Sequence, residues 1–517
     1  MKEKIRTWVG TRQEACQSSL LIRLLATAEG LSLLAAAVCY CLGFPGRNLS
    51  VLMIGSFLIW LGSVFFCLQN LKSRMILLGF DLAVFLFLIG RVVIDILKRA
   101  IRWETYGVDA AFFAVTAIGI SVFCLYMGGI LCEVFTSSPA QLPPSNACAP
   151  KGHHLETFRL VALLLYLFCL AFSFLESAEM LLFMHGRRYE EYYYNFQSVL
   201  PGFVYTFSCI APCALCIYLS TFPKKRSAFF CLLLYVLSNV PTLLIGMRNQ
   251  IALSVIFAFL YYCLRDATGD REKWIGKIEK CLVLLGVPAM MVVFTAAVFL
   301  RNGGKAISNP LDAIAYLIYS QGDMFRNICR GYNTIPQIRH MMGSTRFYTF
   351  GSIIDSVSRS RIGQLLSHTV PFPPGNNAVR ALEGHSFGDI FSYLAHPHYL
   401  EGNGWGTSYL LETYYDFGWL GIVVFSLLLG FFLVWFLRGM RKNWLVKSIL
   451  LMSLTQLFML PRESSTGWLS FLTGVHFWFA VAACVLGSLI FQKLGICAML
   501  SGFQKRICQF FHRSKAK

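Results

Sequence analysis

The feature that most constrains this chain is a series of apolar runs, each about 20 residues long, the length that an α-helix needs to cross roughly 30 Å of hydrocarbon. Peptide groups exposed to lipid must be hydrogen-bonded internally, so long runs favour helices, whereas a membrane barrel would show short alternating segments. We therefore expect an all-α polytopic integral membrane protein. The predicted spans, twelve in number, cover residues 24–44, 50–68, 75–97, 110–132, 158–181, 200–221, 228–246, 249–264, 281–300, 417–437, 444–461 and 467–490.

Charged residues are scarce and unevenly placed, and their placement predicts the orientation. Only 14% of the residues are charged and 56% are hydrophobic, a balance that excludes a soluble enzyme. Basic clusters fall on alternate connections, so the positive-inside rule places both termini in the cytoplasm, and no nucleic-acid partner is needed to explain them. Lys98, Arg99 and Arg102 oppose this map in the connection after the third span. The clusters that follow the rule are Lys2/Lys4/Arg6/Arg12, Lys72/Arg74, Lys224/Lys225/Arg226, Arg438/Arg441/Lys442 and Lys505/Arg506/Arg513/Lys515/Lys517.

One outer connection, residues 301–416, is far longer than the others on this map. A segment of this size without spans of its own is normally functional. It divides the chain into nine spans over 1–300, the loop itself, three spans over 417–490 and a basic cytoplasmic tail over 491–517. We expect the loop to form short helices that lie across the membrane mouth.

Three such helices are predicted inside the loop. Asn309-Pro310 places a proline at a first helical position, at the start of an apolar-periodic run that ends near Gly331. Two amphipathic stretches, residues 350–366 and 387–394, predict the others.

The loop strongly favours arginine over lysine, with eight arginines and the single Lys305. A guanidinium group grips phosphate or carboxylate through two parallel hydrogen bonds, so the set favours an anionic substrate. Any single arginine is explained equally well by an ion pair with a loop acid, or by snorkelling at a helix end. The arginines that we expect to bind a pyrophosphate are Arg248, Arg301, Arg339 and Arg462.

Other chemistries find little support in the sequence. There is no P-loop, GxGxxG, HExxH or CxxC motif, so we expect no cofactor and no metal, and residues 396–398, His-Pro-His, are a weak metal signal. The 18 cysteines predict apolar packing rather than a disulfide scaffold, because only Cys329 lies outside on this map. Arg91 and Asp95, four residues apart on the third predicted helix, are expected to neutralise each other.

Acidic and aromatic residues gather where the loop enters the tenth span. Glu412 and Asp416 lie four apart, on one face of a helical turn, and a carboxylate at an apolar–aqueous boundary can serve as a general base. Tyr409 and Tyr414 could offer a sugar a stacking face and a hydroxyl group. An interfacial aromatic belt with acids at a helix N-terminus explains the same residues without a ligand.

The segment from Gly406 to Gly421 resembles the Wzy-type polymerases of O-antigen and capsular polysaccharide. In that family a G-x-S-x-x-x-E-x-Y-x-x-F-G-x-x-G pattern closes the large outer loop and enters the next helix. The turn Gly246-Met247-Arg248, the dozen spans and the late outer loop also fit. In related ligases and many polymerases of the wider superfamily, a His-Asn pair precedes an E-x-G-x-x-G element by about ten residues. This chain has Thr407 and Ser408 at that spacing, so a catalytic histidine cannot be carried over. The base would then be Glu412, with Asp416 beside it, or His385, or another residue of the loop.

The resemblance implies a bacterial enzyme of the cytoplasmic membrane that joins lipid-linked oligosaccharide repeat units on the outer face. The growing chain would leave undecaprenyl pyrophosphate, without a metal, for the non-reducing end of a new unit. Implied partners are the lipid-linked substrate, membrane lipids, a flippase and chain-length regulator proteins. A ligase that transfers finished polymer, a flippase or other transporter, and a non-catalytic assembly partner remain alternatives.

Overall fold

A computed structural model describes residues 2–136, 153–185, 187, 196–244, 248–269, 272–277, 279–281, 286, 318–343, 346–360, 363–365, 369–373 and 375–494. Within those residues the regular structure is entirely helical, and 11 helices or helix pairs are long and apolar enough to cross a membrane. The predicted all-α polytopic fold is therefore confirmed. The predicted ninth span, 281–300, lies almost wholly outside the described residues.

The N-terminal part of the chain supplies eight of these candidate spans. Two of them are composite, because α3 continues through a π-helical turn into α4, and α9 runs into α10. The elements are α1 (Lys2–Gly43), α2 (Leu49–Gln69), α3 (Leu71–Val84), η1 (Phe85–Ile89), α4 (Gly90–Leu97), η2 (Trp103–Tyr106), α5 (Val108–Thr136), α6 (His153–Met184), α8 (Gly202–Ser220), α9 (Lys225–Ser238), α10 (Val240–Leu244) and α11 (Arg248–Ala267).

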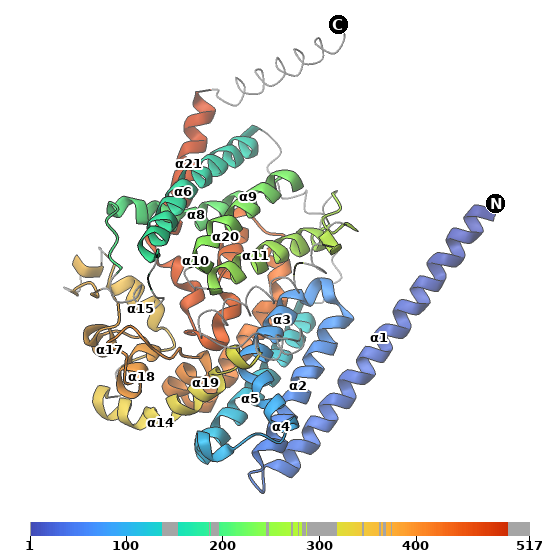
Figure 1. Cartoon of the computed structure of the whole chain (residues 1–517). Coiled ribbons are helices and arrows are strands. Elements are labelled where there is room, and N and C mark those ends of the chain that lie inside the picture. Colours follow the sequence, from blue (N-terminus) through green and yellow to red (C-terminus); the bar gives the residue numbers. More distant parts are fainter. Residues whose placement is uncertain are drawn as a thin grey trace.

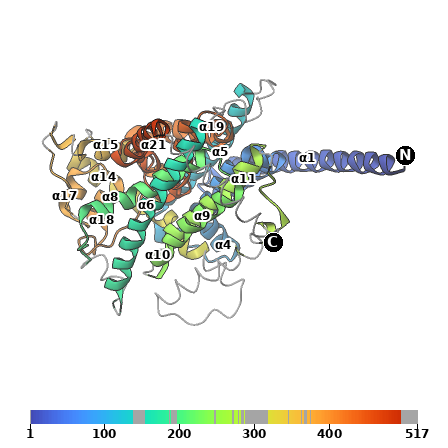
Figure 2. The same ribbon diagram turned by 90° about the horizontal axis from the view of Figure 1, so that it is seen from above.

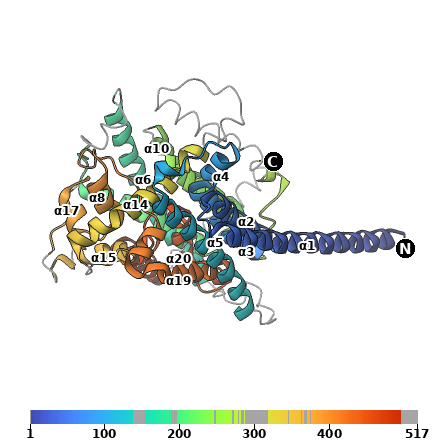
Figure 3. The same ribbon diagram turned by 90° about the horizontal axis from the view of Figure 1, so that it is seen from below.

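The C-terminal part combines short helices with three further candidate spans. Its elements are α14 (Met324–Met342), α15 (Gly351–Ser358), α17 (Ala378–Glu383), α18 (Phe387–Ala395), α19 (Tyr409–Gly439), α20 (Trp444–Leu454), η4 (Leu457–Arg462), η5 (Gly467–Leu472) and α21 (Val475–Lys493). Figures 1–3 show α14, α15, α17 and α18 gathered on one side of the bundle. Helix α1 packs on α2 and projects from the other side.

Two span boundaries differ from the prediction by eight residues, more than the others do. Helix α19 begins at Tyr409, because the Ser408 side chain accepts a hydrogen bond from the Leu410 amide and so caps the helix. Gly418, with φ 62° and ψ −150°, then kinks α19, a conformation that essentially only glycine adopts. The last span begins at Val475 rather than at 467, since residues 467–472 form the separate 3₁₀ helix η5.

The short helices also correct the prediction in part. Helix α18 confirms the helix expected over 387–394, and α15 covers only the first half of 350–366. Helix α14 does not end near Gly331 but runs through it to Met342. A Cβ atom at Gly331 would lie 2.6 Å from Leu411 Cδ1, so the glycine leaves room for the Leu411 side chain of α19 where the two helices meet. The expected start at Asn309-Pro310 lies outside the described residues.

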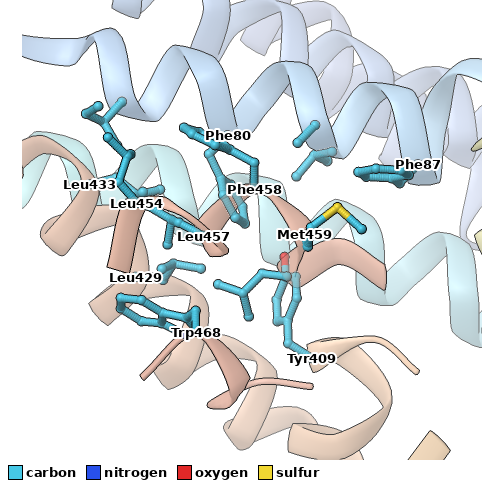
Figure 4. Packing of buried hydrophobic residues seen from close by; sticks show 14 of the residues in the cluster. Phe80, Phe87, Tyr409, Leu429, Leu433, Leu454, Leu457, Phe458, Met459 and Trp468 are labelled. Atoms are coloured by element: carbon cyan, nitrogen blue, oxygen red, sulfur yellow. The ribbon is translucent and has the colours of Figure 1, made fainter. Parts of the chain in front are cut away.

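The core is a continuous apolar cluster across the bundle, and Figure 4 shows the part of it around Phe80, Phe458 and Tyr409. Its closest helix contact joins α5 and α19. A Cβ atom at Gly128 would lie 2.2 Å from the Leu427 carbonyl oxygen, and one at Gly430 would lie 2.0 Å from that of Leu125. Small residues let two membrane helices pack backbone to backbone in this way.

Replacing Gly430 with alanine should therefore force α5 and α19 apart and destabilise the protein by about 1–3 kcal/mol, as overpacked sites do. The measurement is thermal unfolding of the purified protein in detergent. Gly30→Ala in α1 is the matched control, because a Cβ atom there meets nothing within 4 Å. Equal melting temperatures for the two variants would contradict the assigned contact.

Candidate active site

Glu412, a predicted catalytic residue, lies in the first turn of α19 and is completely buried. Its Oε2 atom accepts hydrogen bonds from the Ser465 amide at 2.7 Å and from the Ser465 hydroxyl at 2.5 Å. The buried hydroxyl of Thr407 also interacts with this carboxylate. Glu412 therefore fastens α19 to the short segment between η4 and η5.

Asp416, one turn further along α19, holds the turn that precedes α15. Its carboxylate accepts the amide of Tyr348 at 3.2 Å and that of Thr349 at 2.6 Å. The carbonyl oxygen of Thr349 in turn accepts the hydroxyls of Ser465 and Thr466, both at 3.0 Å. We call this network of Glu412, Asp416, Thr349, Ser465 and Thr466 the anchor. Both predicted acids are thus brought together, in contact with backbone that joins three segments.

His385, the third predicted catalytic residue, pairs with Asp355 of α15. The backbone amide of His385 donates to Asp355 Oδ2, and its Nδ1 atom lies 2.8 Å from Asp355 Oδ1. The two side chains are 27% and 20% exposed, so solvent or substrate can reach them. A carboxylate on Nδ1 orients the imidazole and leaves Nε2 for proton transfer, the arrangement of an oriented general base. No local sequence pattern marks Asp355 as the partner of His385.

The two tyrosines predicted to bind sugar occupy packing positions. Tyr409 is 0% exposed, and its hydroxyl lies 2.6 Å from Ser121 Oγ between α5 and α19. That position, visible in Figure 4, leaves no face for a sugar. Tyr414 packs in an aromatic cluster with Phe113 at 4.5 Å and Trp419 at 5.2 Å between ring centroids. Tyr409 therefore does not fit the predicted stacking role, whereas that of the partly buried Tyr414 stays a prediction.

The described structure places only two of the four predicted pyrophosphate ligands, and these two lie apart. Arg301 and the side chain of Arg248 lie outside the described residues, although the backbone of Arg248 begins α11. Arg339 donates to the Tyr415 carbonyl at 3.1 Å, near the end of α14. Arg462 donates to Gln321 Oε1 at 3.0 Å, before the start of α14. At 1.5 Å per residue these two contacts are separated by about 22 Å of helix.

Arg462 instead belongs to a second group of arginines around Asp323, which we call the arginine cluster. Arg91 of α4 pairs with Asp323 at 2.8 Å, and Arg326 lies 3.7 Å from the same carboxylate. Arg462 also interacts electrostatically with Asp323. Burial, together with the charge of neighbouring Arg326, lowers the pKa of Arg330. Four guanidinium groups share two nearby carboxylates, Asp323 and Glu463, so the cluster has positive charge available for an anion.

The arginine cluster corrects the expectation that Arg91 and Asp95 neutralise each other. Arg91 binds Asp323, while Asp95 accepts a hydrogen bond from the Tyr319 hydroxyl. Arg326 and Arg330 are four residues apart on α14, so their shared helix face was the signal that could have paired them in the sequence. No local pattern could have added Arg91.

Trp405 extends the arginine cluster towards the Gly406–Gly421 pattern, which it directly precedes. The guanidinium of Arg330 lies 4.2 Å from the Trp405 ring centroid, and the His396 ring lies 4.8 Å from it on centroids. Burial lowers the pKa of His396, and the positive charges of His398 and Arg330 add to this effect. At neutral pH His396 is therefore a neutral neighbour and leaves the positive charge here to the arginines.

Together, the fold and these residues define a multi-pass membrane protein whose ionisable side chains gather beside one end of the bundle. Comparison with known families gives a match to the model described as O-antigen polysaccharide polymerase Wzy, over residues 30–494. The chain therefore belongs to the O-antigen polysaccharide polymerase Wzy family. It is a polymerase of O-antigen repeat units, acting on lipid-linked oligosaccharides in the bacterial inner membrane. No curated protein and no solved structure matches the chain.

The anchor makes a prediction about stability. Asp416→Ala removes the acceptor of two backbone amides and should destabilise the protein by about 1–3 kcal/mol, the cost of unsatisfied buried donors. Asp416→Asn, which keeps one carbonyl oxygen, should lose less. Thermal unfolding in detergent measures both. The control is Glu401→Ala, since Glu401 is 58% exposed and contacts only His398 in the described structure. If Asp416→Ala melts with the wild type, the anchor does not hold this turn.

Proposed function

We propose that this protein transfers a growing glycan from undecaprenyl pyrophosphate to the non-reducing end of a new lipid-linked repeat unit, on the outer face of the cytoplasmic membrane. One observation carries the proposal: the arginine cluster and the His385–Asp355 pair lie at opposite ends of the short segment between η4 and η5. Arg462 ends η4 and Gly467 begins η5, and five residues span at most about 18 Å. Gly467 lines a cavity together with Asp355.

The proposed reaction uses these two groups in different roles. His385 takes the proton from the acceptor hydroxyl, and the oxygen forms a bond to the anomeric carbon of the donor chain. The bond from that carbon to the pyrophosphate oxygen breaks, and the lipid pyrophosphate leaves with the electron pair. Guanidinium groups of the arginine cluster stabilise the charge that develops on it. Because these cations can supply the required positive charge, we propose that the step needs no metal.

The remaining predicted residues take supporting places in this proposal. Glu412 and Asp416 position the segment that carries Arg462, rather than acting as bases. Arg339 fixes the backbone at Tyr415. Arg248 and Arg301 stay predicted pyrophosphate ligands. The alternating basic clusters support cytoplasmic termini and an extracytoplasmic site, and a flippase and chain-length regulators remain proposed partners.

The arginine cluster is tested by a chain-length assay. Purified protein in nanodiscs receives the lipid-pyrophosphate repeat unit, with a chelator and without nucleotide, and should produce a ladder of polymers. Arg330→Ala and Arg462→Ala should each slow polymerisation by about 10²–10³-fold, the usual loss when one charge-stabilising donor is removed. Arg47→Ala is the control, because Arg47 is 62% exposed and pairs with the exposed Asp109. A persistent single-repeat band with wild-type protein would refute the polymerase reaction.

The base is tested separately. His385→Gln should lower the single-turnover rate by about 10²–10⁴-fold, the typical contribution of a general base. Asp355→Asn should lower it less, because the amide oxygen can still accept a hydrogen bond from Nδ1 and orient the imidazole. His340→Gln, also in this part of the chain, is the control. A single-turnover rate unchanged by Asp355→Asn would contradict the pairing.

A further inference from the structure

We propose that the cavity bounded by α15, α17, α18 and η5 binds a sugar ring of the acceptor glycan; this deepens the proposed function and rests on it. The cavity has a volume of about 340 Å³, within the range of small-molecule sites. The residues that line it combine carboxylates, a guanidinium, hydroxyls and one aromatic ring: Ser352, Asp355, Ser356, Phe372, Arg380, Asp389, Gly467 and Ser470.

The chemistry of this lining suits a neutral ring with several hydroxyl groups. Carboxylate and guanidinium groups are planar and can each bond two neighbouring hydroxyls. Asp389 accepts the Tyr399 hydroxyl at 3.1 Å on Oδ1, and within the described residues no partner is assigned to Oδ2. Within the same residues the Arg380 guanidinium forms no ion pair. Its carbon lies 5.8 Å from the centroid of the Phe372 ring. Phe372 adds an apolar wall for the C–H face of a sugar.

The charge of the cavity separates it from the arginine cluster. Two carboxylates, Asp355 and Asp389, face one guanidinium, so the lining repels a phosphate that the arginine cluster would attract. The charged part of a lipid-linked sugar and its uncharged part would thus bind on opposite sides of the Arg462–Gly467 segment. A hydroxyl-rich glycan fits this cavity better than a lipid headgroup does.

The walls of the cavity are already fixed by contacts outside it. Ser352 Oγ lies 2.6 Å from Ser464 Oγ, and Thr473 donates to Ser356 Oγ at 3.0 Å. The Arg359 guanidinium covers Phe372 at 4.2 Å from its centroid. A site that is formed before the ligand arrives loses little conformational entropy on binding.

The position of the base assigns the cavity to the acceptor rather than to the donor. Asp355 lines the cavity and also orients His385 through Nδ1. In the proposed reaction the base takes its proton from the acceptor hydroxyl, so the sugar beside the His385–Asp355 pair is the acceptor's terminal sugar. The donor is held by its pyrophosphate at the arginine cluster.

The test measures binding of the oligosaccharide repeat unit released from its lipid by mild acid. Saturation-transfer NMR with the full-length protein in nanodiscs should show saturable binding. Asp389→Asn should weaken it about tenfold, because a hydrogen bond to a charged group is lost. Ser470→Leu, which fills the cavity, should abolish it. Glu383→Gln is the matched control, since Glu383 is 57% exposed and pairs with Arg359 outside the lining. All variants are checked for an unchanged melting temperature.

A second readout identifies the bound sugar as the acceptor. The same oligosaccharide, carrying a fluorescent label at its reducing end, should be incorporated into polymer, and Asp389→Asn should raise its KM with little change in kcat. Absence of saturable binding, or equal binding by Asp389→Asn and Glu383→Gln, would overturn the cavity proposal even if the polymer ladder forms. Binding that follows the predicted order without any ladder would instead refute the proposed function.

Discussion

The pair of hydrogen bonds from Ser465 to the buried carboxylate of Glu412 is the interaction on which the rest of this site depends. A carboxylate is costly to bury without hydrogen-bond donors, so α19 and the segment between η4 and η5 are held to one relative position. Thr349 joins the same network and brings the turn before α15 with it. Arg462 and Gly467, at the two ends of the held segment, thereby acquire fixed places on either side of it.

The sequence predicted eleven of the described membrane spans and the proximity of Glu412 to Asp416, because both depend on local pattern. Runs of apolar residues set the helices, and the motif acids Glu412 and Asp416 do lie together. Their partners could not be predicted, since Asp416 binds amides 67 and 68 residues away and Arg91 binds a carboxylate 232 residues away. The spacing rule that paired Arg91 with Asp95 describes an isolated helix, and here a neighbouring segment competes successfully for both side chains.

Arginine placement illustrates a second limit of sequence reasoning. The bias towards arginine in residues 301–416 was visible in the sequence. It did not distinguish guanidinium groups that bind a backbone carbonyl, such as that of Arg339, from those whose charge is not neutralised by a neighbouring acid. That distinction depends on how many carboxylates lie within reach. Around Asp323 and Glu463 four arginines outnumber the two acids, whereas Arg74 pairs with Glu133 at 2.5 Å. The local ratio of opposite charges, rather than the number of arginines, separates a binding surface from a structural bridge.

The kink at Gly418 has a mechanical consequence. The first turns of α19, which carry Glu412 and Asp416, leave the axis followed by residues 419–439. Membrane helices tilt to match the thickness of the bilayer around them. The kink at Gly418 therefore lets the first turns of α19 lie along the segments to which their acids are bonded, while the membrane-embedded part follows its own axis through the bundle. A single residue thus sets the angle between the site and the span that carries it.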